Sequence, residues 1–152
     1  MTHRFTQLMF TPTVKKVQQT MGSRGAYQRF EAYAPDQAGL GAEERDFIFR
    51  RDSFYMATVS ETGWPYVQHR GGPRGFLKVL DDRTLGFADY RGNRQYVSVG
   101  NLEKADRVSL FLMDYANRRR LKLLGHARLV DRLNDPETLE RLQDVGYGAH
   151  VE

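Results

Sequence analysis

The chain has 152 residues, of which 40% are hydrophobic and 28% charged, and its formal net charge is +4. The absence of cysteine excludes disulfides, thiol catalysis and cysteine-based zinc sites. No apolar run reaches the roughly 20 residues of a membrane helix and no secretory signal is visible, so a cytoplasmic protein without a membrane partner is expected. The positive charge is compatible with an anionic ligand or a nucleic acid and does not decide between them.

Two parts are expected along the chain. Residues 1–41 form a helical lead-in and loop, and residues 42–152 form the main domain. Within the lead-in, Thr11 and Pro12 are typical of a helix start, with threonine as the N-cap and proline as the first helical residue. Residues 34–41 are rich in Gly, Ala and Pro and predict a loop.

The main domain alternates short apolar runs with turn residues, which predicts strands. The expected strands are 54–59, 64–70, 76–80, 84–88, 107–115 and 121–131, with Gly125 as a bulge in the last. The expected helices are 42–52, 93–104 and 134–145. Short strands at close spacing with few helices indicate a mainly β protein with flanking helices (α+β), built as an antiparallel barrel or sandwich.

The stretch from 84 to 115 organises this pattern. The fourth strand ends in the turn Asp89-Tyr90-Arg91-Gly92, and Asn93-Arg94-Gln95 heads the helix expected over 93–104. Free backbone N–H groups at a helix start, with an arginine among them, are typical of a phosphate site. The alternative is that residues 96–99 extend a strand, because Tyr and Val suit both structures.

The order and spacing of these segments resembles the pyridoxamine 5′-phosphate oxidase-like family of FMN-binding split β-barrels, in particular its flavin-nucleotide-binding branch. The resemblance spans about residues 47–130 and lies in the runs DSFYMATVSETGWPYVQHRGG, GFLKVLDDRTLGFADYRGNRQYVSVGNL and NRRRLKLLG. It implies a six-stranded antiparallel split β-barrel and a homodimer with FMN at the subunit interface. The family pattern continues with a further strand beyond the end of this chain, which leaves open a shortened or differently closed barrel.

The resemblance also implies which residues hold the phosphate of FMN. Lys78 stands where the third strand of the family carries a phosphate-reaching lysine. Arg94 would hold the phosphate, beside Asn93 in place of a serine and Gln95 in place of a lysine. Arginine offers a planar fork of donors and lysine a point charge, and both suit a phosphate. Ala88 and Asp89, just before this turn, match positions where the family makes backbone and side-chain contacts with the cofactor.

A second set of residues is expected at the flavin ring. Arg120 falls where relatives place a polar residue that reaches the flavin. By the same resemblance, the approach to the ring lies along Gln68, His69, Arg70, Gly71 and Gly72, where glycine lets the backbone come close to a planar ligand. A cation near the pyrimidine edge, either Arg70 or Arg120, would stabilise the anionic reduced flavin. His69 could equally be a hydrogen-bonded barrel histidine.

These observations predict an FMN-dependent oxidoreductase of unknown substrate, with a small-molecule electron donor and no assigned catalytic side chain. The alternatives are a flavin-binding carrier or sensor without turnover, and a barrel for another ligand such as haem or a deazaflavin. A basic nucleic-acid-binding barrel is a further alternative because of the run Arg118-Arg119-Arg120 near Tyr115. The four histidines are scattered without ligand spacing, so no metal site is expected.

Overall fold

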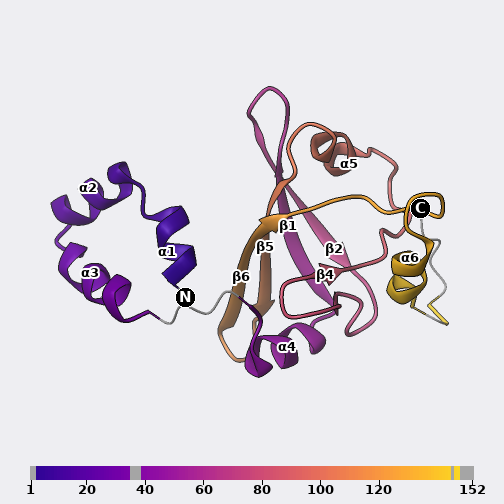
Figure 1. The fold of residues 1–152 in the computed structure, drawn as a ribbon, viewed down its shortest axis with the longest axis horizontal. Coiled ribbons are helices and arrows are strands. Elements are labelled where there is room, and N and C mark those ends of the chain that lie inside the picture. Colours follow the sequence, from indigo (N-terminus) through magenta and orange to yellow (C-terminus); the bar gives the residue numbers. More distant parts are fainter. Residues whose placement is uncertain (1–2, 35–38, 145, 148–152) are drawn as a thin grey trace. The chain divides into compact units, whose positions relative to one another are not determined.

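The computed structural model describes residues 3–34, 39–144 and 146–147. The chain divides into two compact units, Met1–Leu40 and Gly41–Glu152. The described part of the first unit contains α1 (His3–Met9), α2 (Pro12–Thr20) and α3 (Arg24–Tyr33) (Figure 1). The predicted helix start is confirmed, because Thr11 Oγ1 accepts a hydrogen bond from Val14 N over 3.3 Å. Part of the loop expected over 34–41 lies outside the described residues.

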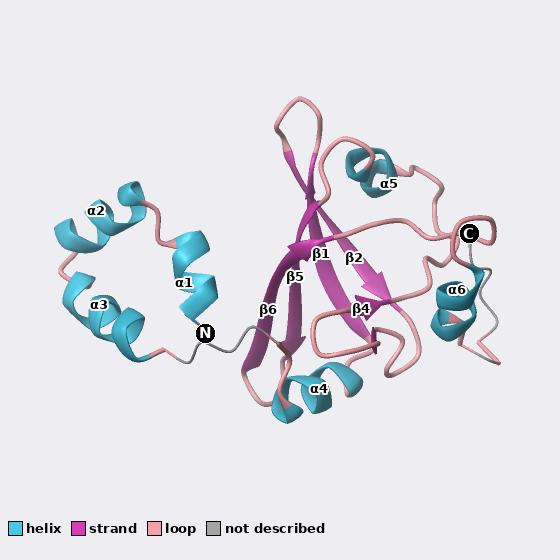
Figure 2. Ribbon diagram, viewed as in Figure 1, coloured by secondary structure: helices cyan, strands magenta, loops and turns pink. Residues whose placement is uncertain are grey.

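The second unit is built on a four-stranded antiparallel sheet with helices around it, which confirms the α+β prediction (Figure 2). The strand order is β2-β1-β5-β6. The strands are β1 (Ser53–Val59), β2 (Pro65–Gly71), β5 (Arg107–Asp114) and β6 (Arg119–His126). β1 and β2 form a hairpin around Gly63, whose φ of 86° is a conformation that favours glycine.

Two further strands pair separately from this sheet. They are β3 (Lys78–Val79) and β4 (Leu85–Gly86), each much shorter than the expected 76–80 and 84–88. Phe76 and Leu77 are both buried, at 1% and 2% exposure. Phe76 N donates a hydrogen bond to the Pro73 carbonyl over 2.9 Å, so the backbone closes a turn here and β3 begins only after it. The described strands therefore form a four-stranded and a two-stranded antiparallel sheet.

The prediction for β6 was wrong at its end. The expected strand 121–131 with a bulge at Gly125 is instead Arg119–His126. Gly125 pairs one-to-one with Val108 in an unbroken antiparallel register, so the ladder contains no extra residue there. The register sets which side chains of β6 face the same side as those of β5.

The helices of the second unit are α4 (Ala42–Phe49), α5 (Val97–Leu102) and α6 (Pro136–Leu142). α4 begins where the Glu44 carboxylate accepts a hydrogen bond from Gly41 N over 3.0 Å. α6 begins where Asp135 Oδ1 accepts one from Thr138 N over 3.1 Å. Both helices end before the predicted 52 and 145, and residue 145 lies outside the described residues. Among the described residues, none of the helices combines the length and apolar character needed to cross a bilayer.

The helix expected over 93–104 was wrong at its start. α5 begins only at Val97 and has six residues. Arg94 and Tyr96 adopt positive φ values of 61° and 53°, and a left-handed residue interrupts a right-handed helix. The polar cluster therefore lies in a loop ahead of α5, and the expected coincidence of Arg94 with a helix N-terminus is absent.

The core of this unit lies on one face of the four-stranded sheet. Phe54 of β1 is its centre: its ring stacks on Phe76 at 5.5 Å and meets Phe87 edge-on at 5.1 Å. Ile48 of α4 and Leu112 of β5 are also fully buried. Burying such side chains contributes roughly 1.5–3 kcal/mol each. This apolar cluster fixes which sheet face points inward and which remains open.

Candidate cofactor site

The outward face of the four-stranded sheet carries an open groove. Alternation along β1 turns Phe54 and Met56 into the core and Tyr55 outward. The groove has a volume of about 730 Å³, within the roughly 300–1,000 Å³ of small-molecule and cofactor sites. Its lining combines apolar and aromatic side chains with two cations: Tyr55, Ala57, Val67, Ser109, Phe111, Met113, Tyr115, Arg120 and Lys122.

Two of the residues predicted for the flavin ring lie on this face. Arg120 lines the groove itself. His69 pairs with Tyr55 across β1 and β2, with ring centroids 5.4 Å apart. Lys122 is a second groove cation, and its Nζ lies 5.4 Å from the centre of the Phe111 ring. The outward face therefore offers flat apolar walls and positive charge, as a planar anionic ligand requires.

The rim of the groove carries exposed apolar and aromatic side chains. Val67 is 60% exposed and Tyr115 is 69% exposed. The hydroxyl groups of Tyr55 and Tyr115 lie 3.4 Å apart, and this hydrogen bond raises the pKa of the Tyr115 phenol. The groove is thus lined by the hydroxyl groups of two tyrosines as well as by the cations Arg120 and Lys122.

The other two predicted ring residues with long side chains point to the opposite face, because alternate residues of β2 alternate sides. Gln68 Oε1 accepts a hydrogen bond from Ser98 Oγ over 2.8 Å and so ties β2 to α5. Arg70 forms an ion pair through Nη1 with Asp89, and its guanidinium lies 5.8 Å from the Phe87 ring. Its Nε is buried without a hydrogen-bond partner among the described residues. The structure therefore divides the predicted stretch between two faces.

The two glycines after these residues have different surroundings. A Cβ on Gly71 would lie 3.3 Å from Cε1 of His69, so this position is close to the outward face. A Cβ on Gly72 would lie 2.6 Å from Cγ of Phe76, which fills that space from the core side. The backbone approach expected for a ring stays a prediction for Gly71, while Gly72 leaves room for Phe76.

Two of the predicted phosphate residues, Lys78 and Asp89, form ion pairs, and the adjacent positions of Asp89 and Tyr90 in the chain link these two pairs. Lys78 Nζ forms an ion pair with Asp144, whose other carboxylate oxygen accepts a hydrogen bond from the Tyr90 hydroxyl. Tyr90 follows Asp89, the partner of Arg70, in the chain. Burial and then the hydrogen bond to Asp144 raise the pKa of the Tyr90 phenol. We name the residues Arg70, Lys78, Asp89, Tyr90 and Asp144 the charged cluster.

The remaining predicted phosphate residues lie outside the charged cluster, one in the core and three in an exposed loop. Ala88 is buried at 4% exposure and serves the core. Asn93, Arg94 and Gln95 are exposed in the loop before α5. Asn93 Oδ1 accepts a hydrogen bond from Gln95 N over 3.2 Å, and Arg94 Nε donates one to the Tyr96 hydroxyl over 3.4 Å. This loop presents its arginine at the surface.

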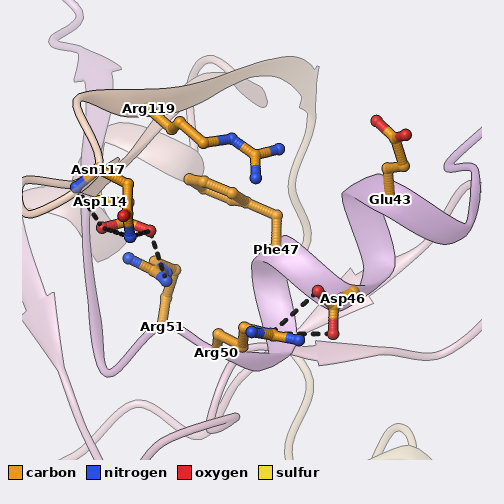
Figure 3. A pocket seen from close by; sticks show the side chains of 8 residues that line it. All are labelled: Glu43, Asp46, Phe47, Arg50, Arg51, Asp114, Asn117 and Arg119. Atoms are coloured by element: carbon orange, nitrogen blue, oxygen red, sulfur yellow. Dashed lines mark hydrogen bonds and ion pairs between the residues drawn. The ribbon is translucent and has the colours of Figure 1, made fainter.

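A second cavity, of about 420 Å³, was not anticipated (Figure 3). Figure 3 shows Phe47 between Arg51 and Arg119, whose guanidinium carbons lie 4.8 and 5.6 Å from the ring centre. Arg51 also pairs with Asp114 over 3.2 Å, and Asn117 bonds both carboxylate oxygens of Asp114. The charged residues of the expected helix 42–52 were the only sequence signal for this cavity. They are explained equally well as charges that match the helix dipole.

The arginine run does not form one basic surface. Arg118 adopts a φ of 52° in the turn before β6. Arg119 lies over Phe47, whereas Arg120 lines the groove. Neighbouring strand residues point to opposite faces, so the charges of Arg119 and Arg120 separate. This arrangement weakens the nucleic-acid alternative, which needs cations gathered along one path.

The antiparallel sheet, the second hairpin and the flanking helices define the class of the protein as a split-barrel-like α+β fold. The sequence model of the family described as "Pyridoxamine 5'-phosphate oxidase" matches residues 40–151, well over half of the chain. The chain belongs to this family. No curated protein matches it.

Solved structures are similar to the chain at low sequence identity. A HupZ variant from Group A Streptococcus has a TM-score of 0.50 at 15% identity, covering 74% of this chain and 94% of that chain. A protein from Clostridium acetobutylicum, related to general stress protein 26 of B. subtilis and of the pyridoxinephosphate oxidase family, has a TM-score of 0.47 at 20% identity. That alignment covers 68% of this chain and 66% of the other. At such identities the likeness concerns the fold alone.

Proposed function

We propose that this protein is an FMN-binding flavoprotein that acts as a homodimeric FMN-dependent oxidoreductase. The observation that carries the proposal is the outward groove, where aromatic walls and the cations Arg120 and Lys122 share one sheet face. Family membership over residues 40–151 supports a flavin as the ligand of such a groove.

The residues fit the parts of FMN unequally. The groove residues match a flat apolar ring with a polar edge. In the charged cluster, Arg70 keeps a buried Nε without a partner among the described residues, as a site for an anion does. The donors Arg70 and Lys78 are the right chemistry for a phosphate, although each holds a carboxylate in this structure. Because Arg70 faces the opposite side of the sheet from the groove, the groove and the charged cluster that hold one FMN would belong to different subunits of the proposed homodimer.

The chemistry divides between cofactor and chain. When bound, FMN supplies hydride or two-electron transfer. The groove walls would exclude water from one side of a planar ligand, and Arg120 would supply a positive charge that stabilises an anionic reduced flavin. No side chain of the groove need act as an obligatory acid or base.

FMN titration followed by flavin fluorescence tests the binding proposal. Arg120→Glu is expected to weaken FMN binding, because it replaces a charge-assisted contact worth roughly 1.5–3 kcal/mol with repulsion. Arg132→Glu is the matched control, because Arg132 is exposed in a turn and makes the same change of charge. Equal affinities in the two variants, or no FMN binding by the native protein, would contradict the proposal.

Steady-state oxidation of a reduced nicotinamide by the FMN-loaded protein then separates an enzyme from a carrier or sensor. Turnover that depends on bound FMN supports the oxidoreductase. Tight FMN binding with no turnover with any reduced donor would favour the carrier or sensor. Retention of haem but not FMN after gel filtration would favour a different ligand for the same groove.

The homodimer is proposed on the same sheet face. Val67, Tyr115 and Val59 expose apolar surface there, at 60%, 69% and 40%. Exposed apolar patches on a soluble domain mark interaction surfaces, and a second copy would cover them together with the flavin. Sedimentation analysis should show Val67→Lys as a monomer, while Leu133→Lys, at a 96% exposed turn position, stays dimeric. A monomeric native protein would refute the dimer.

A further inference from the structure

We propose that Asp144 is a built-in competitor for the anionic ligand of Lys78. The segment that follows α6 places a carboxylate on the cation that the phosphate of FMN would use. The inference rests on the proposed FMN function and adds a means of regulating that site. Its basis is the set of contacts that the described part of the C-terminal segment makes with β3 and β4.

The carboxylate of Asp144 uses both of its oxygens. One oxygen accepts from Lys78 Nζ and the other from the Tyr90 hydroxyl. The side chains of Asp144 and Lys78 are only 14% and 23% exposed. A phosphate presents the same kind of charged acceptor oxygens, so it could take the same two donors. Both donors become available in one step when the carboxylate leaves.

The end of α6 and Tyr147 hold this carboxylate in place. Leu142, at the end of α6, is 4% exposed and packs against Gly86 of β4, where a Cβ would lie 2.5 Å from its Cδ2. Arg141 Nη2 donates a hydrogen bond to the Leu80 carbonyl over 3.3 Å. The Tyr147 ring lies 4.8 Å from that of Tyr90. Residues 141–144 and 147 therefore contact the β3–β4 hairpin and the turn after it, and we call them the strap.

The charge balance of the charged cluster agrees with a competitor. Arg70 is paired with Asp89 and Lys78 with Asp144, so two positive charges face two negative charges. A phosphate dianion added to this neutral set would meet two carboxylates. Departure of Asp144 alone removes one of them and frees Lys78, so anion binding and release of the strap are coupled. The apparent affinity for the anion therefore equals the affinity of the released form multiplied by the fraction of molecules in which the strap is released.

The test compares Asp144→Asn with the native full chain in FMN titrations and in titrations with inorganic phosphate. Asp144→Asn is expected to bind both probes more tightly, by on the order of tenfold, because the released fraction rises. Glu140→Gln, which removes an exposed carboxylate from α6, is the matched control and should bind as the native protein does. Arg141→Ala keeps the ion pair but removes a strap contact, so it should give a smaller gain.

The outcomes separate this inference from the proposed function. Tighter binding of FMN and of phosphate by Asp144→Asn supports both the competitor and the flavin proposal. Tighter phosphate binding without FMN binding in any variant supports the competitor and overturns the flavin. Unchanged affinity for both probes in Asp144→Asn and Arg141→Ala overturns the competitor, and it leaves the flavin proposal standing where FMN binds the native protein. Equal gains in Asp144→Asn and Glu140→Gln overturn it as well, because they show a general charge effect.

Discussion

Asn101 of α5 donates a hydrogen bond from Nδ2 to Thr58 Oγ1 of β1 over 2.9 Å, and the two side chains are 8% and 1% exposed. This contact joins a short helix to the central sheet across the core face. α5 has only six residues, too few to be stable by itself, so tertiary contacts of this kind hold it. Gln68 and Ser98 make a second such contact.

We expect Asn101→Ala to lower the free energy of unfolding by about 1–3 kcal/mol, because it leaves the buried Thr58 hydroxyl without its partner. Urea denaturation measures the change. The double variant Asn101→Ala/Thr58→Val no longer has the unsatisfied hydroxyl. Its loss in free energy of unfolding is therefore expected to be smaller than the sum of the two single losses. Strictly additive losses would show that the side chains of Asn101 and Thr58 do not stabilise each other.

Gly72 and Gly100 should respond to alanine with opposite signs. A Cβ on Gly72 would lie 2.6 to 2.9 Å from buried Phe76 atoms, so Gly72→Ala is expected to cost roughly 1–3 kcal/mol through overpacking. Gly100 lies in α5 with nothing within 4 Å of such a Cβ, so Gly100→Ala should stabilise by about 0.5–1 kcal/mol through helix propensity. Thermal unfolding of both variants checks the signs, and a loss in both would refute the argument from local space.

Asp114 should make stability depend on pH in the acid range. The hydrogen bond from Asn117, and then Arg51, lower the pKa of this carboxyl below its ordinary value. A depressed folded pKa contributes stability that is present above the unfolded value of about 3.9 and is lost as pH falls through the folded value. Asn117→Ala should raise the pKa of Asp114 and destabilise at neutral pH, with the difference fading in strong acid.

Carboxyl NMR titration measures the pKa of Asp114, and urea unfolding at neutral and acid pH measures the linked stability. Asn93→Ala is the control, since Asn93 bonds within its own exposed loop. A stability difference between native and Asn117→Ala protein that persists unchanged in strong acid would assign the effect to packing and not to the charge.

Thr11 should control the stability of α2 locally. Thr11→Ala removes the side-chain acceptor of Val14 N, and losing an N-cap costs about 0.5–2 kcal/mol. Hydrogen exchange is expected to quicken at the amides of α2 and not at those of β1 or β5. Thr13→Ala, two positions into the helix, should leave those rates equal or slower, because alanine is the better helix former.

Local signals were sufficient for much of the fold. The N-cap Thr11 and the short apolar runs that became β1 and β2 each act within a few residues, so the sequence alone indicates them. The family pattern extends this to the whole sheet, and the match over 40–151 confirms it. The length of β3 and the start of α5 depend on backbone turns at Phe76 and at Arg94 and Tyr96 that the hydrophobic pattern does not show, and there the predictions failed.

The candidate site divides in the same way. By itself the sequence determined the residue types of the site, since charge and ring chemistry belong to side chains wherever they lie. Only the tertiary structure decided that His69 and Arg120 share the outward face while Arg70 turns to the other, because strand register sets direction. It also decided that Lys78 meets Asp144, since an ion pair between residues far apart in sequence forms only when the chain brings them together.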